Sequence, residues 1–124
     1  MNTRRVVVTG IGGITAFGRD WQSIQTAFKA EKNAVKHMDW SDRFPELEAQ
    51  LGAPIEGYSP PKHWTRKQLR SMGRVSHLCV DAAEQALMDA GLLGDESITD
   101  GRMGVACGSS VGSTQDIGDL GELL

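Results

Sequence analysis

Cys107 has the local setting of a nucleophile on a tight turn. It ends the apolar part of "GVACGSS" (residues 104–110) and is followed by a glycine and two hydroxyl side chains. A cysteine nucleophile needs thiolate character from a helix N-terminus or a basic neighbour, and usually a base within reach. A helix after the turn would supply the dipole, but no histidine is tied to Cys107 by the sequence. Because cysteine is also common at the end of a buried strand, the local sequence leaves both roles open.

The other metal-ligating and nucleophilic side chains are scattered along the chain. His37, His63 and His77 lie far apart, and Cys79 with Cys107 gives neither a disulfide framework nor a zinc spacing. We therefore expect no metal site, reduced thiols and a cytoplasmic location.

A glycine cluster follows the first apolar run, in "TGIGGITAFG" (residues 9–18). Such a turn can bring a pyrophosphate to a helix N-terminus. Here the dinucleotide spacing fails, because Thr15 stands where the third glycine belongs and several residues separate the glycines from the next helix. A plain tight turn is favoured over nucleotide binding.

Positive charge gathers between Gly57 and Val80, a stretch without Asp or Glu. Because three of its arginines are spaced i, i+4 and i+8, they are expected on one helix face. The cluster is either a docking patch for an anionic partner or a solvated helix face. Trp64 alone gives no stacking platform, so nucleic acid is not expected. The candidate docking residues are Arg66, Lys67, Arg70 and Arg74.

The elements that would position these residues follow the order strand, helix, irregular segment, helix, strand, helix. Strands are expected at 5–9 and 103–107, from consecutive apolar residues typical of a parallel sheet. Helices are expected at 21–30 after an Asp20 cap, after a Thr65 cap, over 72–90 ending at Gly91, and from Ser113 or Thr114. The order indicates an α/β fold with parallel strands.

Composition is that of one ordinary globular domain. The 124 residues are 40% hydrophobic and 23% charged, with a net charge of −3. No apolar run has the length of a membrane span or a signal peptide. Because the chain stops on the apolar run "GELL" with no helix stop signal, we expect it to be a fragment of a longer protein.

Three segments in this order resemble the start of a β-ketoacyl-(acyl carrier protein) synthase of the elongating type, in the condensing-enzyme, thiolase-like family. They are "RRVVVTGIG" at 4–12, "RKQLRSMGRVSHLCVDAAEQALMDAGL" at 66–92 and "RMGVACGSSVGS" at 102–113. The resemblance implies a thiolase-like layered α/β fold, with residues 1–124 as the first part of its N-terminal half. It implies a dimeric acyltransferase that condenses malonyl-carrier protein with an acyl thioester in fatty acid or related polyketide or polyene synthesis.

The resemblance also reassigns the candidate residues. The family's nucleophile lies in a later T-A-C-S-S-G motif, so Cys107 is expected to be a buried, inert core residue. The nucleophilic cysteine and both catalytic histidines are expected beyond Leu124, and the fragment alone is expected to be inactive. Arg66, Lys67 and Arg70 match the patch that docks acyl carrier protein, and Val111 matches a position lining the acyl pocket. No cofactor is implied, since phosphopantetheine arrives on the carrier protein.

Two departures and two alternatives accompany this interpretation. Ser71 stands where the family often has another basic residue, and "TAFG" at 15–18 replaces the usual S-P-x-G turn. These features suggest a divergent member from a specialised pathway. A non-catalytic, chain-length-factor-like partner of a ketosynthase is the first alternative, and the residues after Leu124 would distinguish it. A Rossmann-like nucleotide binder is the second.

Overall fold

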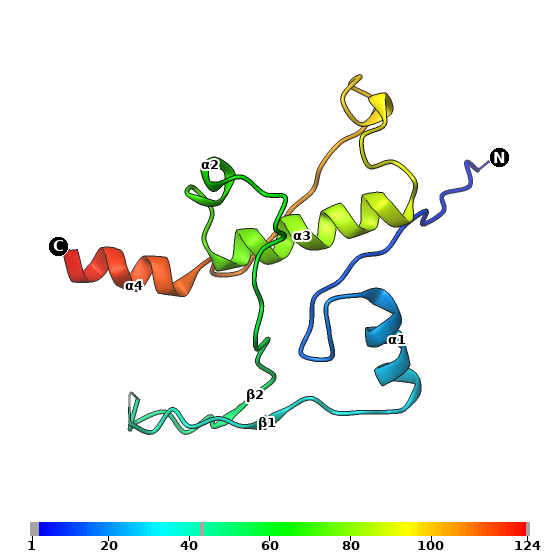
Figure 1. Cartoon of the computed structure of the whole chain (residues 1–124). Coiled ribbons are helices and arrows are strands. Elements are labelled where there is room, and N and C mark those ends of the chain that lie inside the picture. Colours follow the sequence, from blue (N-terminus) through cyan, green and yellow to red (C-terminus); the bar gives the residue numbers. More distant parts are fainter. Residues whose placement is uncertain (1–2, 43, 124) are drawn as a thin grey trace. The chain divides into compact units, whose positions relative to one another are not determined.

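The computed structural model describes residues 3–42 and 44–123, which divide into two compact units. One unit joins the N-terminal segment up to Gly12 to the chain from Ser59 onward, and the other comprises Gly13–Tyr58. In the first unit, α2 (Arg66–Leu69), α3 (Arg74–Asp89), the 3-10 helix η1 (Glu96–Ile98) and α4 (Thr114–Leu123) follow one another (Figure 1). The second unit holds α1 (Trp21–Lys29) and the strands β1 (Lys36–His37) and β2 (Leu51–Gly52).

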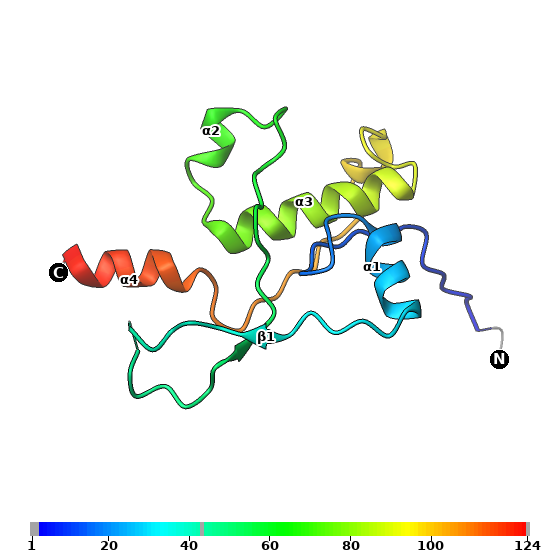
Figure 2. The same ribbon diagram turned by 60° about the horizontal axis from the view of Figure 1, so that its bottom comes forward.

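In the first unit, two extended segments lie beside helix α3. The segments at 3–12 and 100–113 both run along it in extended form, and both views show them beside the helix (Figures 1 and 2). A Cβ on Gly10 would lie 2.2 Å from the Ala86 carbonyl oxygen, and one on Gly12 would lie 2.1 Å from that of Ala82. Only a residue without a side chain fits this close to a helix backbone. The glycines that resemble a phosphate-binding turn are therefore packed against α3.

Helix ends follow local rules and agree with the sequence-based expectations. The Asp20 carboxylate caps α1 by accepting from the Ser23 amide at 2.8 Å and from the Ser23 hydroxyl at 2.7 Å. These two hydrogen bonds lower the pKa of Asp20 below its ordinary value. In the first unit, α3 ends at Asp89, and Gly91 follows its Ala90 cap with a φ of 68°, which suits a glycine C′ residue.

The two expected core strands are not strands in this structure. Residues 5–9 and 103–107 are extended, but the only strands among the described residues are β1 and β2, which pair antiparallel with Lys36 opposite Gly52. A strand requires a ladder of backbone hydrogen bonds with a neighbour, and neither segment has one here. Their side chains are accordingly open, with Val6 93% and Val105 92% exposed.

The second unit is small and loosely filled. Ile24 and Ala27 of α1 are its buried residues, and the Phe17 and Phe28 rings meet edge to face at 5.9 Å. The divergent "TAFG" segment closes as a turn, since Thr15 and Gly18 exchange backbone hydrogen bonds of 2.9 and 3.1 Å. In the described part of the chain no helix is long and apolar enough to cross a bilayer.

Candidate functional site

The candidate docking surface consists of Arg66, Lys67 and Arg70, all exposed at α2 and its C-terminal cap. Together they line a shallow hollow of about 390 Å³. In the part of the chain that the structure describes, none of the three forms an ion pair with a carboxylate. Three uncompensated cations around one depression provide a site for a group bearing several negative charges.

One helix face was expected to carry Arg66, Arg70 and Arg74, and this expectation is wrong. Helix α2 ends at Leu69, and Arg74 begins a separate helix, α3, after an extended Gly73. Position 73 also has no room for a side chain, because a Cβ there would collide with the Asp116 carboxylate and lie 2.5 Å from the Ser113 hydroxyl. Arg74 therefore belongs to a different element from the three residues that line the hollow.

Helix α2 is only four residues long, so its position depends on contacts at its start. The Gln68 amide donates to Thr65 Oγ1 at 3.3 Å, and the Thr65 amide donates to Gln68 Oε1 at 2.8 Å, which together form a capping box. The cap expected at Thr65 is thus confirmed, with a reciprocal partner in Gln68.

A carboxylate of α3 holds the segment that leads into α2. Glu84 Oε2 accepts from the Trp64 indole at 3.0 Å, and its Oε1 lies 2.6 Å from His63 Nε2. The Trp64 ring also packs against His77, with centroids 6.2 Å apart. We call Glu84, Trp64 and His63 the Glu84 clamp. Sequence reasoning missed it, because 20 or more residues separate Glu84 from its partners and no local pattern joins them.

Val111 lies on a turn that is fixed to the first turn of α3. The Gly112 amide donates to Ser109 Oγ at 3.0 Å, and the φ of Gly112 is 74°. Directly after the turn, Ser113 Oγ accepts from the Val75 amide at 3.3 Å. The Val111 side chain is 61% exposed, so it is available to line a cavity completed by other residues.

Cys107 is exposed in this structure, which corrects the expectation of a buried core residue. The physical reason is the missing strand partner of residues 103–107, which leaves the side chains of this segment uncovered. The Cys107 sulfur lies 3.4 Å from that of Cys79. The structure places no described histidine in hydrogen-bond contact with Cys107, so the base that a nucleophile requires is absent from these contacts.

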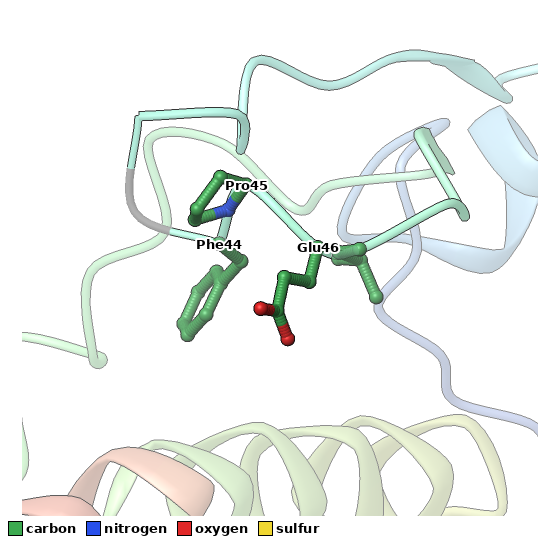
Figure 3. A pocket seen from close by; sticks show the side chains of 4 residues that line it. Phe44, Pro45 and Glu46 are labelled. Atoms are coloured by element: carbon green, nitrogen blue, oxygen red, sulfur yellow. The ribbon is translucent and has the colours of Figure 1, made fainter.

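The possible metal ligands and a second surface hollow do not form a catalytic site among the described residues. Among the described residues, no three His, Cys, Asp or Glu side chains gather as metal ligands. A second hollow of about 570 Å³ is lined by four consecutive residues, and Figure 3 shows the Phe44 ring, Pro45 and the Glu46 carboxylate around it. It is a surface feature of one loop, lined by Phe44, Pro45, Glu46 and Leu47.

Comparison with known proteins identifies the family. Residues 3–122 match the family model described as "Beta-ketoacyl synthase, N-terminal domain". The chain therefore belongs to the β-ketoacyl synthases, and the match runs through both compact units. A crystal structure of a beta-ketoacyl synthase from Burkholderia phymatum superimposes on 98% of the chain with a TM-score of 0.85 and 53% identity. The thiolase-like fold expected from the sequence is thereby confirmed.

Curated relatives fall into two named groups. The chain is 39% identical over 105 residues to nodulation protein E of Rhizobium leguminosarum bv. trifolii, covering 85% of this chain and 25% of that protein. It is 28% identical over 124 residues to 3-oxoacyl-[acyl-carrier-protein] synthase 2 of Synechocystis, covering 100% of this chain and 29% of the relative. The chain also covers 30% of the Burkholderia structure, so it spans between a quarter and a third of the length of these proteins.

Proposed function

We propose that the complete protein is a 3-oxoacyl-(acyl carrier protein) synthase of the elongating type. The observation that carries the proposal is the family match over residues 3–122, together with relatives named for this reaction. In that reaction an acyl group waits as a thioester on an enzyme cysteine, and malonyl-carrier protein loses CO₂. The resulting enolate carbon attacks the acyl carbonyl, which releases the cysteine thiol and leaves a 3-oxoacyl-carrier protein.

Within this function, residues 1–124 supply recognition and not covalent chemistry. The nucleophilic cysteine and the two histidines belong to the part of the enzyme beyond Leu124, and Cys107 takes no part in the reaction. We therefore expect the 124-residue chain alone to perform no condensation. The phosphopantetheine is delivered by the carrier protein, and neither metal nor nucleotide is required. The enzyme is expected to be cytoplasmic and to act as a dimer.

Arg66, Lys67 and Arg70 form the docking surface for acyl carrier protein in this proposal. Three exposed cations without described ion pairs suit the acidic helix of a carrier protein. Arg74 contributes from the start of α3 as a neighbouring charge. Val111, on the turn next to α3, lines part of the acyl pocket, where its small side chain leaves room for a longer or bulkier chain.

The divergent "TAFG" turn at 15–18 extends this proposal to a specialised pathway such as polyketide or polyene synthesis. No observation specifically favours the alternative that the protein is a non-catalytic, chain-length-factor-like partner of a ketosynthase.

Reversal of charge on the docking surface tests the proposal. In the complete enzyme, Lys67→Glu/Arg70→Glu should weaken carrier-protein binding at least about tenfold at low salt, because two attractive charges become repulsive. The difference in dissociation constant between the variant and the unaltered enzyme should become smaller as salt rises, since screening weakens the interactions between exposed charges. The dissociation constant is measured by calorimetry across a salt series.

The matched control is Lys29→Glu/Lys32→Glu, which makes the same change of net charge in the other unit. It should leave the dissociation constant within about twofold, because neither lysine lines the hollow formed by Arg66, Lys67 and Arg70. Equal loss of binding in both double variants would contradict the docking assignment, because the effect would then follow net charge alone.

A further inference from the structure

The two cysteines of the chain lie side by side although 28 residues separate them. Cys79 Sγ, on α3, is 3.4 Å from Cys107 Sγ, on the extended segment before the Val111 turn. The two thiols share a hydrogen bond, and both residues are exposed free cysteines. Neither thiol takes part in the proposed function.

Elements on both sides hold the pair in place. Cys79 is in the second turn of the 16-residue helix α3. The segment that carries Cys107 is fixed a few residues later, where the Val75 amide donates to Ser113 Oγ at 3.3 Å. A disulfide needs its sulfurs about 2.05 Å apart, so closure requires them to approach by about 1.4 Å.

We propose that Cys79 and Cys107 form a redox-active thiol pair that closes to a disulfide in the presence of a peroxide. One thiolate attacks a peroxide oxygen, which gives a sulfenic acid and releases hydroxide from hydrogen peroxide. The second sulfur then attacks the sulfenic sulfur, so that an S–S bond forms, the S–O bond breaks and the oxygen leaves as water. Two thiols and one peroxide thus yield one disulfide and two waters, and a dithiol reductant reverses the change.

The environment of Cys79 sets how closure depends on pH. The hydrogen bond with Cys107, together with some desolvation, raises the pKa of the Cys79 thiol above its ordinary value of 9.0. Thiolate is the reactive form, so the rate of closure should increase as pH rises above neutral.

Closure joins α3 to the segment that leads into the Val111 turn. The bond constrains the unfolded chain by closing a loop between positions 28 residues apart, so the oxidised chain should unfold at a higher temperature than the reduced chain. Reduction of the disulfide should restore the lower unfolding temperature.

The test uses the reduced 124-residue chain with hydrogen peroxide, followed by alkylation of the remaining thiols and mass spectrometry. We expect a monomer with no alkylated cysteine and one tryptic species joining the two cysteine peptides. In concentrated urea the yield of the internal disulfide, relative to sulfinic acid and disulfide-linked dimer, should fall at least about tenfold, because the unfolded chain lacks the high effective concentration that lets the second sulfur capture the sulfenic acid.

Cys79→Ser and Cys107→Ser are the matched variants, each of which should keep one alkylatable thiol or its sulfenic acid and form no internal bond. Three results would overturn the proposal: two alkylated thiols after peroxide treatment, a disulfide-linked dimer as the main product, or equal yields of the internal disulfide in buffer and urea. The comparison of buffer with urea needs only the unaltered chain, so it decides the question even where a serine variant folds poorly.

Discussion

Gly10 and Gly12 show how a single residue can be required by an element far away in the sequence. Neither has a positive φ, and each is needed because the backbone of α3 occupies the space where a Cβ would project. The sequence suggests a phosphate-binding turn at these positions, and the spacing already argues against it. The structure supplies the physical explanation, since close approach to a helix requires the same residue type as a phosphate cradle.

Gly10→Ala should destabilise the first unit. The added methyl would lie 2.2 Å from the Ala86 carbonyl oxygen and 2.7 Å from the Ala90 amide nitrogen, so helix and segment must separate. Overpacking of this kind costs about 1–3 kcal/mol of unfolding free energy. Urea unfolding followed by circular dichroism measures the loss. Gly104→Ala is the control, because nothing lies within 4 Å of its Cβ position. Equal midpoints for the two variants would contradict the packing described here.

Residue-level predictions succeed where both partners lie within one turn of the chain. Asp20 and Thr65 are recognisable caps because each bonds a residue three positions later. The partners of Glu84 and Cys79 lie 20 and 28 residues away, and only the folded chain brings them together. The exposure of Cys107 was mispredicted for a related reason, since burial depends on what covers a segment and not on its own sequence.

At the scale of elements, helices are more predictable than strands. A helix satisfies its own backbone hydrogen bonds, so α1 and α3 begin and end, and α4 begins, close to the residues expected from caps and periodicity. A strand is completed by its neighbours, and residues 5–9 and 103–107 therefore show the composition of strands without the pairing. The spacing of the basic residues did not predict the division of their segment into α2 and α3, with Gly73 extended between the two helices.

Removal of the Glu84 clamp should loosen α2 while leaving α3 intact. Glu84→Ala deletes both acceptors and leaves the partly buried Trp64 indole without its described partner. Hydrogen bonds to a charged group are worth about 1.5–3 kcal/mol, so local opening should increase at least about tenfold. Limited trypsin digestion measures this opening as faster cleavage after Lys62, Arg66 and Lys67.

Glu84→Gln keeps one acceptor oxygen and should show an intermediate rate of cleavage. Glu122→Ala removes an exposed carboxylate from α4 and should match the unaltered chain. Unchanged cleavage in Glu84→Ala would show that the clamp does not hold α2 in place.

At the scale of the molecule, much apolar surface is uncovered. Val6, Val8 and Val105 are 93%, 80% and 92% exposed, and α4 presents Ile117 and Leu120 in the same way. Extensive exposed apolar surface promotes association. The buried hydrophobic residues among those described are Ile24 and Ala27, so little core is available to offset the exposure.

The isolated 124-residue chain should therefore bind anilinonaphthalene sulfonate strongly and associate as its concentration rises. Val6→Lys/Val105→Lys should lower dye fluorescence several-fold and raise solubility, because it charges the two extended segments. Fluorescence titration and light scattering provide the measurements, with circular dichroism to verify that helix content is unchanged. Weak dye binding by the unaltered chain would contradict the exposure of these segments.

Gly73 has a consequence for how sequences in this family can diverge. Its Cβ position is filled by the Asp116 carboxylate and the Ser113 hydroxyl, so the start of α3 and the start of α4 share one small space. A side chain gained at position 73 requires a shorter one at position 116 or a shifted α4. The two positions should therefore vary together among relatives. A side chain at position 73 would be accepted only after position 116 had become shorter or α4 had shifted.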